Sequence, residues 1–129
     1  MKNIKVFLGG TCNKSTWRTA LIPKLKIDYF NPLVEVWTEE AYQEELLQRE
    51  RCNYCLYVIT VEMIGVYSIA EAIDDSNKRP KKTIFCFIEA GFSKHQIKSL
   101  KAVGKMVQHN GAYWFKDLNE VALFLNQNQ

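Results

Sequence analysis

Five short runs of strand-forming residues recur along the chain, separated by longer segments with a different periodicity. The runs are rich in β-branched and aromatic residues, and some end at glycine or at an Asn-Pro step, which is typical of β-strands. They are Ile4–Leu8, Lys26–Phe30, Tyr54–Thr60, Thr83–Ile88 and Ala112–Phe115. The third and fourth runs are almost wholly apolar, which favours parallel strands covered on both faces.

The segments between these runs predict helices. Apolar residues recur in them near helical spacing, and several open with a capping hydroxyl or carboxylate followed by Glu or Gln. The predicted helices are Ser15–Leu25, Thr38–Arg51, Ser68–Asn77, Ser93–Val107 and Asp117–Leu125. Pro23 is expected to kink or shorten the first of them. The second is strongly polar, which predicts that one of its faces is solvated.

Strand and helix therefore alternate five times, and this alternation implies βαβ units with right-handed crossovers. We expect an α/β fold of three layers, with a doubly wound parallel five-stranded sheet in the flavodoxin-like order 2-1-3-4-5. The chain has 129 residues, of which 47% are hydrophobic. That length and composition suit one domain over residues 1–129 with its own core.

The charge balance points away from polyanionic partners. The formal net charge is only +3, and the densest basic cluster, Lys78–Lys82, falls on a turn between a helix and a strand. We interpret this cluster as a solvated turn, and we expect neither a nucleic-acid nor a membrane partner. The first apolar run is too short for a signal peptide or a membrane span, so the expected location is the cytoplasm.

The four cysteines are expected to stay reduced in that compartment. Cys52 and Cys55 form a C-x-x-C pair, but the pair straddles the start of a strand, whereas a redox motif would open a helix. A structural zinc site would need two further ligands at suitable spacing, and the remaining Cys and His residues are scattered along the chain. We therefore expect no metal site.

Ligands in open α/β sheets bind beyond the carboxyl ends of the strands, at the point where the strand order reverses. Here strands one and three flank that point. Gly9-Gly10-Thr11 follows strand one, and its glycines would let backbone amides approach a phosphate or sugar, or simply form a tight turn. Arg18 nearby is either a phosphate partner or a solvated helix residue.

The segment after strand three carries the acid of greatest interest. Glu71 follows Gly65, Tyr67 and Ser68 at the predicted start of a helix. Ser68 and Glu71 match the S-x-x-E pattern of a capping box, in which the glutamate only ties down the helix start. Alternatively, Glu71 points into the crevice as a nucleophile, with the hydroxyl of Tyr67 beside it.

Four segments of the chain together resemble the nucleoside 2-deoxyribosyltransferase-like family and, more distantly, the deoxynucleoside-monophosphate N-glycosidases that share its fold. The segments are Lys5–Thr11, Tyr29–Pro32, Val58–Thr60 and Gly65–Glu71. The resemblance implies cleavage of the bond between base and deoxyribose by a glutamate at the position of Glu71. It also implies that no metal or organic cofactor is needed, and that the chain forms a homo-oligomer in which a neighbouring subunit completes the pocket.

The chain departs from the family at two points, and the chemistry that the resemblance implies suggests the remaining candidates. Asn53 stands where the family often has an aspartate at the start of strand three, and the turn before Glu71 is longer than the family's compact Gly-x-Gly-x-Glu. Candidates for donating a proton to the departing base are Glu62, Tyr67, Asn53 and Asp75. Expected contacts to the sugar, the base or the pocket wall are Gly9, Gly10, Thr11, Asn13, Asn31, Trp37, Asn53, Gly65 and Ser68.

Three other functions stay open at this point. A non-catalytic nucleotide-binding or sensing module on the same fold would keep the crevice and lack turnover. A flavin-binding flavodoxin fits less well, because the first loop lacks a hydroxyl-rich phosphate cradle. A purely structural or interaction domain is the last alternative, since fold does not determine function.

Overall fold

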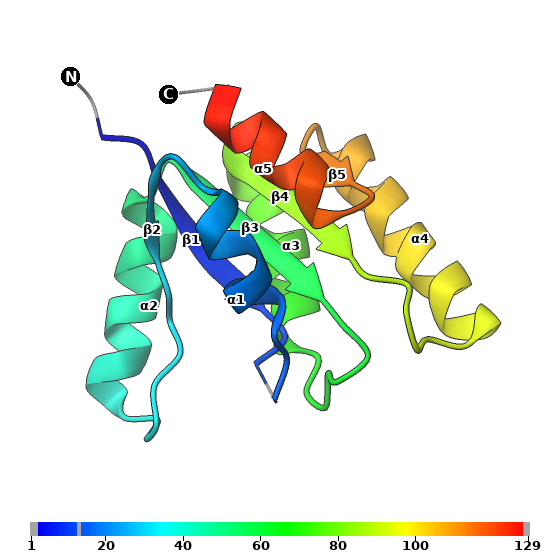
Figure 1. Ribbon diagram of the computed structural model, residues 1–129, viewed down its shortest axis with the longest axis horizontal. Helices are drawn as coiled ribbons and strands as arrows, with labels where there is room; N and C mark the ends of the chain where they lie inside the picture. The colour runs from blue at the N-terminus through cyan, green and yellow to red at the C-terminus, as the bar shows by residue number, and fades with distance from the viewer. Residues whose placement is uncertain (1–2, 13, 128–129) are drawn as a thin grey trace.

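The computed structural model describes residues 3–12 and 14–127, and it contains a five-stranded parallel sheet in the order β2-β1-β3-β4-β5. This is the predicted flavodoxin-like order, so the fold class is confirmed. The strands are β1 (Lys5–Gly10), β2 (Asp28–Phe30), β3 (Tyr54–Ile59), β4 (Thr83–Phe87) and β5 (Tyr113–Phe115). β1 and β3 lie side by side at the centre of the sheet (Figure 1).

Helices cover both faces of the sheet and complete the three layers (Figure 1). The helices are α1 (Trp17–Leu21), α2 (Glu39–Arg51), α3 (Tyr67–Lys78), α4 (Lys94–His109) and α5 (Leu118–Gln127). Short 3-10 helices follow α1 at Ile22–Lys24 and precede β4 at Pro80–Lys82. Pro23 stands at the start of the first 3-10 helix, so the predicted shortening of helix one is confirmed.

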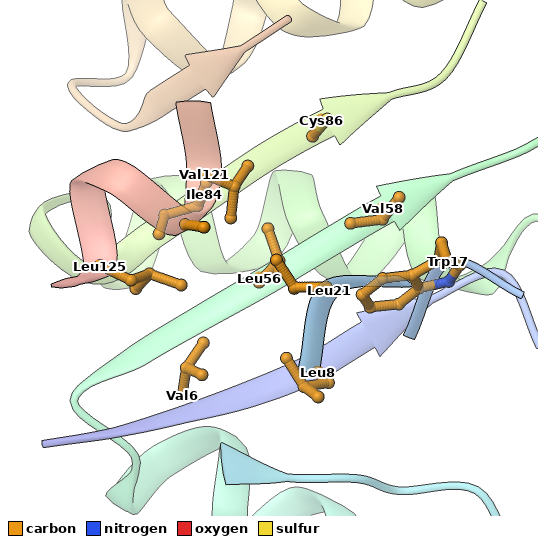
Figure 2. Close-up of a cluster of buried hydrophobic side chains, with 11 residues drawn as sticks. Val6, Leu8, Trp17, Leu21, Leu56, Val58, Ile84, Cys86, Val121 and Leu125 are labelled. Carbon is orange, nitrogen blue, oxygen red and sulfur yellow. The ribbon is translucent and has the colours of Figure 1, made fainter. Parts of the chain in front are cut away.

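Alternate residues of each central strand face opposite layers, and this separates the core into two clusters. Val6 and Leu8 of β1 pack on one face against α1 and α5, as Figure 2 shows. Phe7, between them in sequence, packs on the other face against the layer that contains α3 and α4. Both faces of the parallel sheet are therefore buried, as the apolar runs predicted.

The predicted capping signals hold for α2 and α4. The Thr38 hydroxyl accepts a hydrogen bond from the Ala41 amide at 3.1 Å. Ser93 and Gln96 form a reciprocal capping box. At α5, Asp117 accepts from the Glu120 amide at 2.9 Å, but the Glu120 carboxylate accepts from the Lys116 amide and so completes no capping box.

α2 differs from the other helices in how it is attached. It is polar along most of its length, and Arg49 is its one buried residue. The Arg49 side chain contacts Tyr57 of β3 and Asp75 of α3, so α2 reaches the sheet through a charged group. Among the helices of the described ranges, none has the length and apolar composition needed to cross a membrane.

Candidate functional site

A pocket of about 400 Å³ opens at the carboxyl ends of β1, β2 and β3. Its walls come from the turn after β1, the segment after β2, helix α2, the segment after β3 and the start of α3. This is the switch point between β1 and β3, where the strand order indicated a ligand site. Nine of the residues singled out from the sequence line it: Gly9, Gly10, Thr11, Arg18, Trp37, Gly65, Tyr67, Ser68 and Glu71.

The floor of the pocket depends on a close approach between β1 and β3. Gly10 has a positive φ of 115°, and a Cβ at this position would lie 2.1 Å from the Val58 carbonyl oxygen. The chain then returns to the sheet, because the Thr11 amide donates to that same oxygen at 2.8 Å. The Thr11 hydroxyl accepts from the Thr60 amide at 3.0 Å. Glycine is therefore required here by the packing of the strands.

Arg18 plays neither of the roles that the sequence suggested. It is only 3% exposed, and its guanidinium donates to the carbonyl oxygens of Leu8 at 2.8 and 3.0 Å and of Thr11 at 2.8 Å. Burial lowers its pKa. Carbonyls at the end of β1 therefore occupy most of its hydrogen-bonding capacity, and the interpretations as a phosphate partner or a solvated residue are both wrong.

Glu71 is not part of a capping box. Helix α3 begins at Tyr67 with Val66 as its N-cap, and no side-chain capping bond is present there. Ser68 is therefore the second helical residue, and Glu71 lies two residues further into the helix than the S-x-x-E pattern places it. The capping interpretation of Glu71 is wrong because the helix starts earlier than predicted.

The Glu71 carboxyl group is buried and has few partners. The residue is 5% exposed, and its Oε2 lies 3.4 Å from Nη1 of Arg49. Within the described part of the chain, this oxygen is buried without a hydrogen-bond partner. Burial, reinforced by the charge of Glu45, raises the pKa of Glu71 to about 8, although Arg49 acts in the opposite direction.

Behind Glu71, away from the pocket lining, Arg49 joins three acids to a buried phenol. Its Nη2 donates to Asp75 at 3.0 Å and to Asp74 at 3.4 Å, and its Nε donates to the Tyr57 hydroxyl at 3.1 Å. The Tyr57 hydroxyl in turn donates to Asp75. Burial would lower the pKa of Arg49, but Tyr57, Asp75 and Glu71 raise it, so the guanidinium stays charged.

Two aromatic residues stand at the pocket rim. Trp37 is 57% exposed and meets the ring of Tyr42 edge-on, with 5.9 Å between the ring centroids. Tyr67 is similarly exposed, and burial together with a hydrogen bond to Tyr42 raises its pKa. These rings offer flat apolar surface where a planar ligand would enter.

Sequence reasoning missed a second carboxyl group in the pocket, which is half-buried. Glu45 of α2 lines it, and burial raises the pKa of Glu45. Glu45 stands four residues before Arg49, so the two share one face of α2. The four-residue spacing of Glu45 and Arg49 was the one signal in the sequence that this face of α2 reaches the pocket, because the helix was predicted only to have a solvated face. Glu35 and Cys12 also line the pocket without having been singled out.

Three of the predicted site residues that the structure describes do not line the pocket. The Glu62 carboxylate accepts a hydrogen bond from Thr60, and the Asn31 amide oxygen accepts from Leu33, and neither residue is part of the lining. Asn53 precedes β3 and therefore lies at the opposite, amino-terminal end of the sheet, where its side chain accepts from the Lys5 amide at 2.9 Å. Asn13 lies outside the described residues.

The remaining sequence features find local structural roles. The Cys55 thiol donates to the Arg49 carbonyl, and burial raises its pKa to about 12. In residues 3–12 and 14–127, no three His, Cys, Asp or Glu side chains are placed to hold a metal ion. Lys82 of the basic cluster donates to two carbonyls at the end of α2, those of Glu50 and Cys52.

Comparison with known proteins adds one result. A family model described as "Nucleoside 2-deoxyribosyltransferase like" matches residues 3–91. No curated protein and no solved structure gives a significant match. The matched segment runs from before β1 to just beyond β4, and it contains every residue that lines the pocket.

Proposed function

This chain belongs to the nucleoside 2-deoxyribosyltransferase-like family, and we propose that it cleaves or transfers at the N-glycosidic bond of deoxynucleosides, with Glu71 as nucleophile. One observation carries the proposal. Glu71 is a nearly buried carboxyl group that lines a pocket at the switch point, and its Oε2 has no hydrogen-bond partner among the described residues. A buried group of this kind is destabilising for the fold, which favours a role in chemistry.

The proposed reaction has two displacements, as in retaining glycoside hydrolysis. The Glu71 carboxylate attacks the anomeric carbon, a C–O bond forms, and the C–N bond breaks with its electron pair leaving on the base. A covalent glycosyl ester results. A second base or a water molecule then attacks the same carbon, and the electron pair of the ester bond returns to Glu71.

The departing base needs a proton or a hydrogen-bond donor, and Glu45 is the better candidate in the pocket. Burial raises its pKa, which favours the protonated form that a general acid requires. Glu62 and Asn53, considered from the sequence, do not line the pocket, and Asp75 is fully buried in the Arg49 network. Tyr67 lies at the rim, where its hydroxyl suits substrate positioning.

Charge favours neutral nucleosides over their monophosphates. Three carboxyl groups line the pocket, those of Glu35, Glu45 and Glu71. Among the described residues that line the pocket, Arg18 is the one with a positive charge, and backbone carbonyls hold its guanidinium. A 5′-phosphate would thus lie among carboxyl groups, without a free guanidinium to receive it.

We also propose that a second copy of the chain covers the pocket mouth. The segments after β2 and β3 expose several apolar side chains beside the pocket: Leu33, Val34, Val36, Ile64 and Val66. Clusters of this kind mark interaction surfaces in soluble proteins. Light scattering of the wild type and of Ile64→Asp tests this, and a wild type that stays monomeric at high concentration contradicts it.

The central test is release of free base. The protein is incubated with deoxynucleosides, with and without a second base, and the products are separated by chromatography. We expect base release or exchange by the wild type and none by Glu71→Gln. Glu45→Gln should lower the rate with poorly activated bases, whereas Glu44→Gln, its exposed neighbour on α2, should not.

Two outcomes of this assay reject parts of the proposal. Activity retained by Glu71→Gln would show that the nucleophile is a different group. Binding of nucleosides by the wild type without any turnover would favour the non-catalytic sensing module.

A further inference from the structure

Arg49 is unusual because it is the one buried residue of a polar, loosely attached helix. It is 6% exposed, whereas its neighbours Glu50 and Arg51 are exposed. A buried guanidinium is strongly unfavourable unless it is paired and hydrogen-bonded. The contacts that compensate it come from two other elements, β3 and α3.

These contacts hold the guanidinium from one side. Nε faces the Tyr57 hydroxyl and Asp75 Oδ2, and Nη2 faces Asp75 Oδ1. Asp75 is itself fixed, because it is fully buried and also accepts from Tyr57 and Arg79. The planar fork of an arginine held in this way has a defined orientation. Nη1 is then the nitrogen that faces Glu71 Oε2, at 3.4 Å.

We propose that Arg49 is a positioning residue that favours the ionised form of the Glu71 carboxyl group and turns its Oε2 away from the pocket, leaving Oε1 to react. This rests on the proposed function of Glu71. The charged groups that act on Glu71 are Glu45 and Arg49 of α2 and Asp74 and Asp75 of its own helix. The Tyr67 hydroxyl of α3 also interacts with Glu71, and Tyr57 of β3 acts through Arg49. Arg49 is the single cation among them, and every other charge favours the neutral, unreactive form.

The same contact assists the second displacement. When the acceptor attacks the anomeric carbon, the C–O bond to Glu71 breaks and a negative charge develops on the carboxylate beside Arg49. A preorganised cation at the site of developing charge stabilises that transition state. Removal of Arg49 is therefore expected to slow both the formation and the breakdown of the glycosyl ester.

A direct titration tests the proposal without relying on catalysis. Protein labelled with ¹³C at the Glu side-chain carboxyl is titrated by NMR, and Glu71→Gln identifies the Glu71 signal. The wild-type signal should titrate near pH 8. In Arg49→Met it should move upward by about one pH unit or more, in Arg49→Lys by less, and in the exposed control Arg51→Met not at all.

Enzyme kinetics give the second readout. If base release occurs, kcat/KM should rise with pH along the same titration. At neutral pH it should fall about tenfold or more in Arg49→Met, because one pKa unit changes the ionised fraction about tenfold. Part of this loss should recover at higher pH, whereas a purely structural role would lower the rate equally at every pH.

The outcomes separate the two proposals. An unchanged Glu71 titration in Arg49→Met overturns the role of Arg49, whatever the activity. A wild type without base release overturns the proposed function, while the titration still decides what Arg49 does to Glu71. If Arg49→Met fails to fold, Arg49→Lys decides, since it keeps the charge but cannot reach Asp75, Tyr57 and Glu71 together.

Discussion

Glu45 of α2 and Glu71 of α3 line the same pocket, and the charge of Glu45 is the second largest cause, after burial, of the raised pKa of Glu71. Burial also raises the pKa of Glu45. Two carboxyl groups in one pocket rarely ionise together, and their protons are released in steps that belong to the pair. The pocket is thus built around two coupled acids, and the pKa of one of them, Glu71, is raised to about 8.

The first prediction concerns stability against pH. The pKa of Glu71 is about 8 in the folded protein and about 4.5 when the side chain is solvated. Between these values the folded state binds more protons than the unfolded state, so the contribution of Glu71 to stability falls as the pH rises. Glu71→Gln removes this term and should stabilise the protein progressively from pH 5 to pH 9.

The gain reaches a few kcal/mol at most, since one pKa unit corresponds to about 1.4 kcal/mol. Urea denaturation of both proteins across this pH range measures it. Glu44→Gln, at an exposed position of α2, is the control and should show no such trend. A constant difference between Glu71→Gln and the wild type at all pH values would contradict the buried, proton-binding state of Glu71.

The second prediction concerns Gly10. A Cβ at this position would lie within 2.5 Å of two backbone atoms of Val58, and the positive φ adds strain for any other residue. Gly10→Ala should therefore destabilise the protein by about 3 kcal/mol or more. Gly65→Ala is the control, because a Cβ there has nothing within 4 Å. Thermal unfolding of both variants gives the comparison, and equal stability would contradict the packing of β1 against β3.

The third prediction uses the same open space around Gly65. Because this residue lines the pocket and its Cβ direction is empty, a large side chain can occupy the pocket without displacing the core. Gly65→Leu should keep the stability of the wild type while weakening nucleoside binding about tenfold or more, which corresponds to about 1.4 kcal/mol. Calorimetric titration measures the affinity, with Gly65→Ala as the matched variant. Unchanged affinity in Gly65→Leu would place the ligand elsewhere.

The sheet order and the position of the pocket followed from the alternation of strands and helices together with one rule about ligand sites. The apolar runs around Val6 and Val58 were unambiguous, because strands buried on both faces show little polar content. Asn53 was misplaced for a physical reason. It precedes β3, and in a parallel sheet the residue before a strand lies at the end opposite the ligand site.

The side chains that tune Glu71 could not be predicted from local patterns. α2 carries little apolar periodicity, so nothing in its sequence distinguishes the buried Arg49 from the exposed Arg51. The burial of Arg49 depends on Tyr57 and Asp75, which belong to other elements and lie 8 and 26 residues further along the chain. The S-x-x-E pattern at Ser68 also matched a real capping motif by chance, and only the helix start at Tyr67 decided against it.

The fourth prediction tests the charge of the pocket. Because three acids line it and Arg18 is held by carbonyls, a deoxynucleoside should bind about tenfold or more tightly than its 5′-monophosphate at low salt. Added salt screens the repulsion, so the ratio should shrink as ionic strength rises. The measurement compares the affinities of a deoxynucleoside and of its 5′-monophosphate with the same base. Tighter binding of the monophosphate would indicate a phosphate contact from a second copy of the chain.

The last prediction uses Cys12 as a reporter of occupancy. Cys12 is exposed and lines the pocket, whereas Cys52, Cys55 and Cys86 are buried, and burial raises the pKa of each of these three thiols. Since the thiolate is the reactive form, N-ethylmaleimide should modify Cys12 alone in the folded protein. Mass spectrometry should show one adduct under native conditions and four after denaturation, because the chain has 4 cysteines.

A bound deoxynucleoside should slow the modification of Cys12, and modified protein should bind nucleoside more weakly because the adduct occupies part of the pocket. Cys12→Ser controls for both effects, since it should keep binding and be insensitive to the reagent. If Cys12→Ser treated with N-ethylmaleimide still lost nucleoside binding, modification of a group other than Cys12 would be the cause. An adduct rate unchanged by saturating nucleoside would place the ligand away from the turn after β1, and the assignment of this pocket would then be wrong.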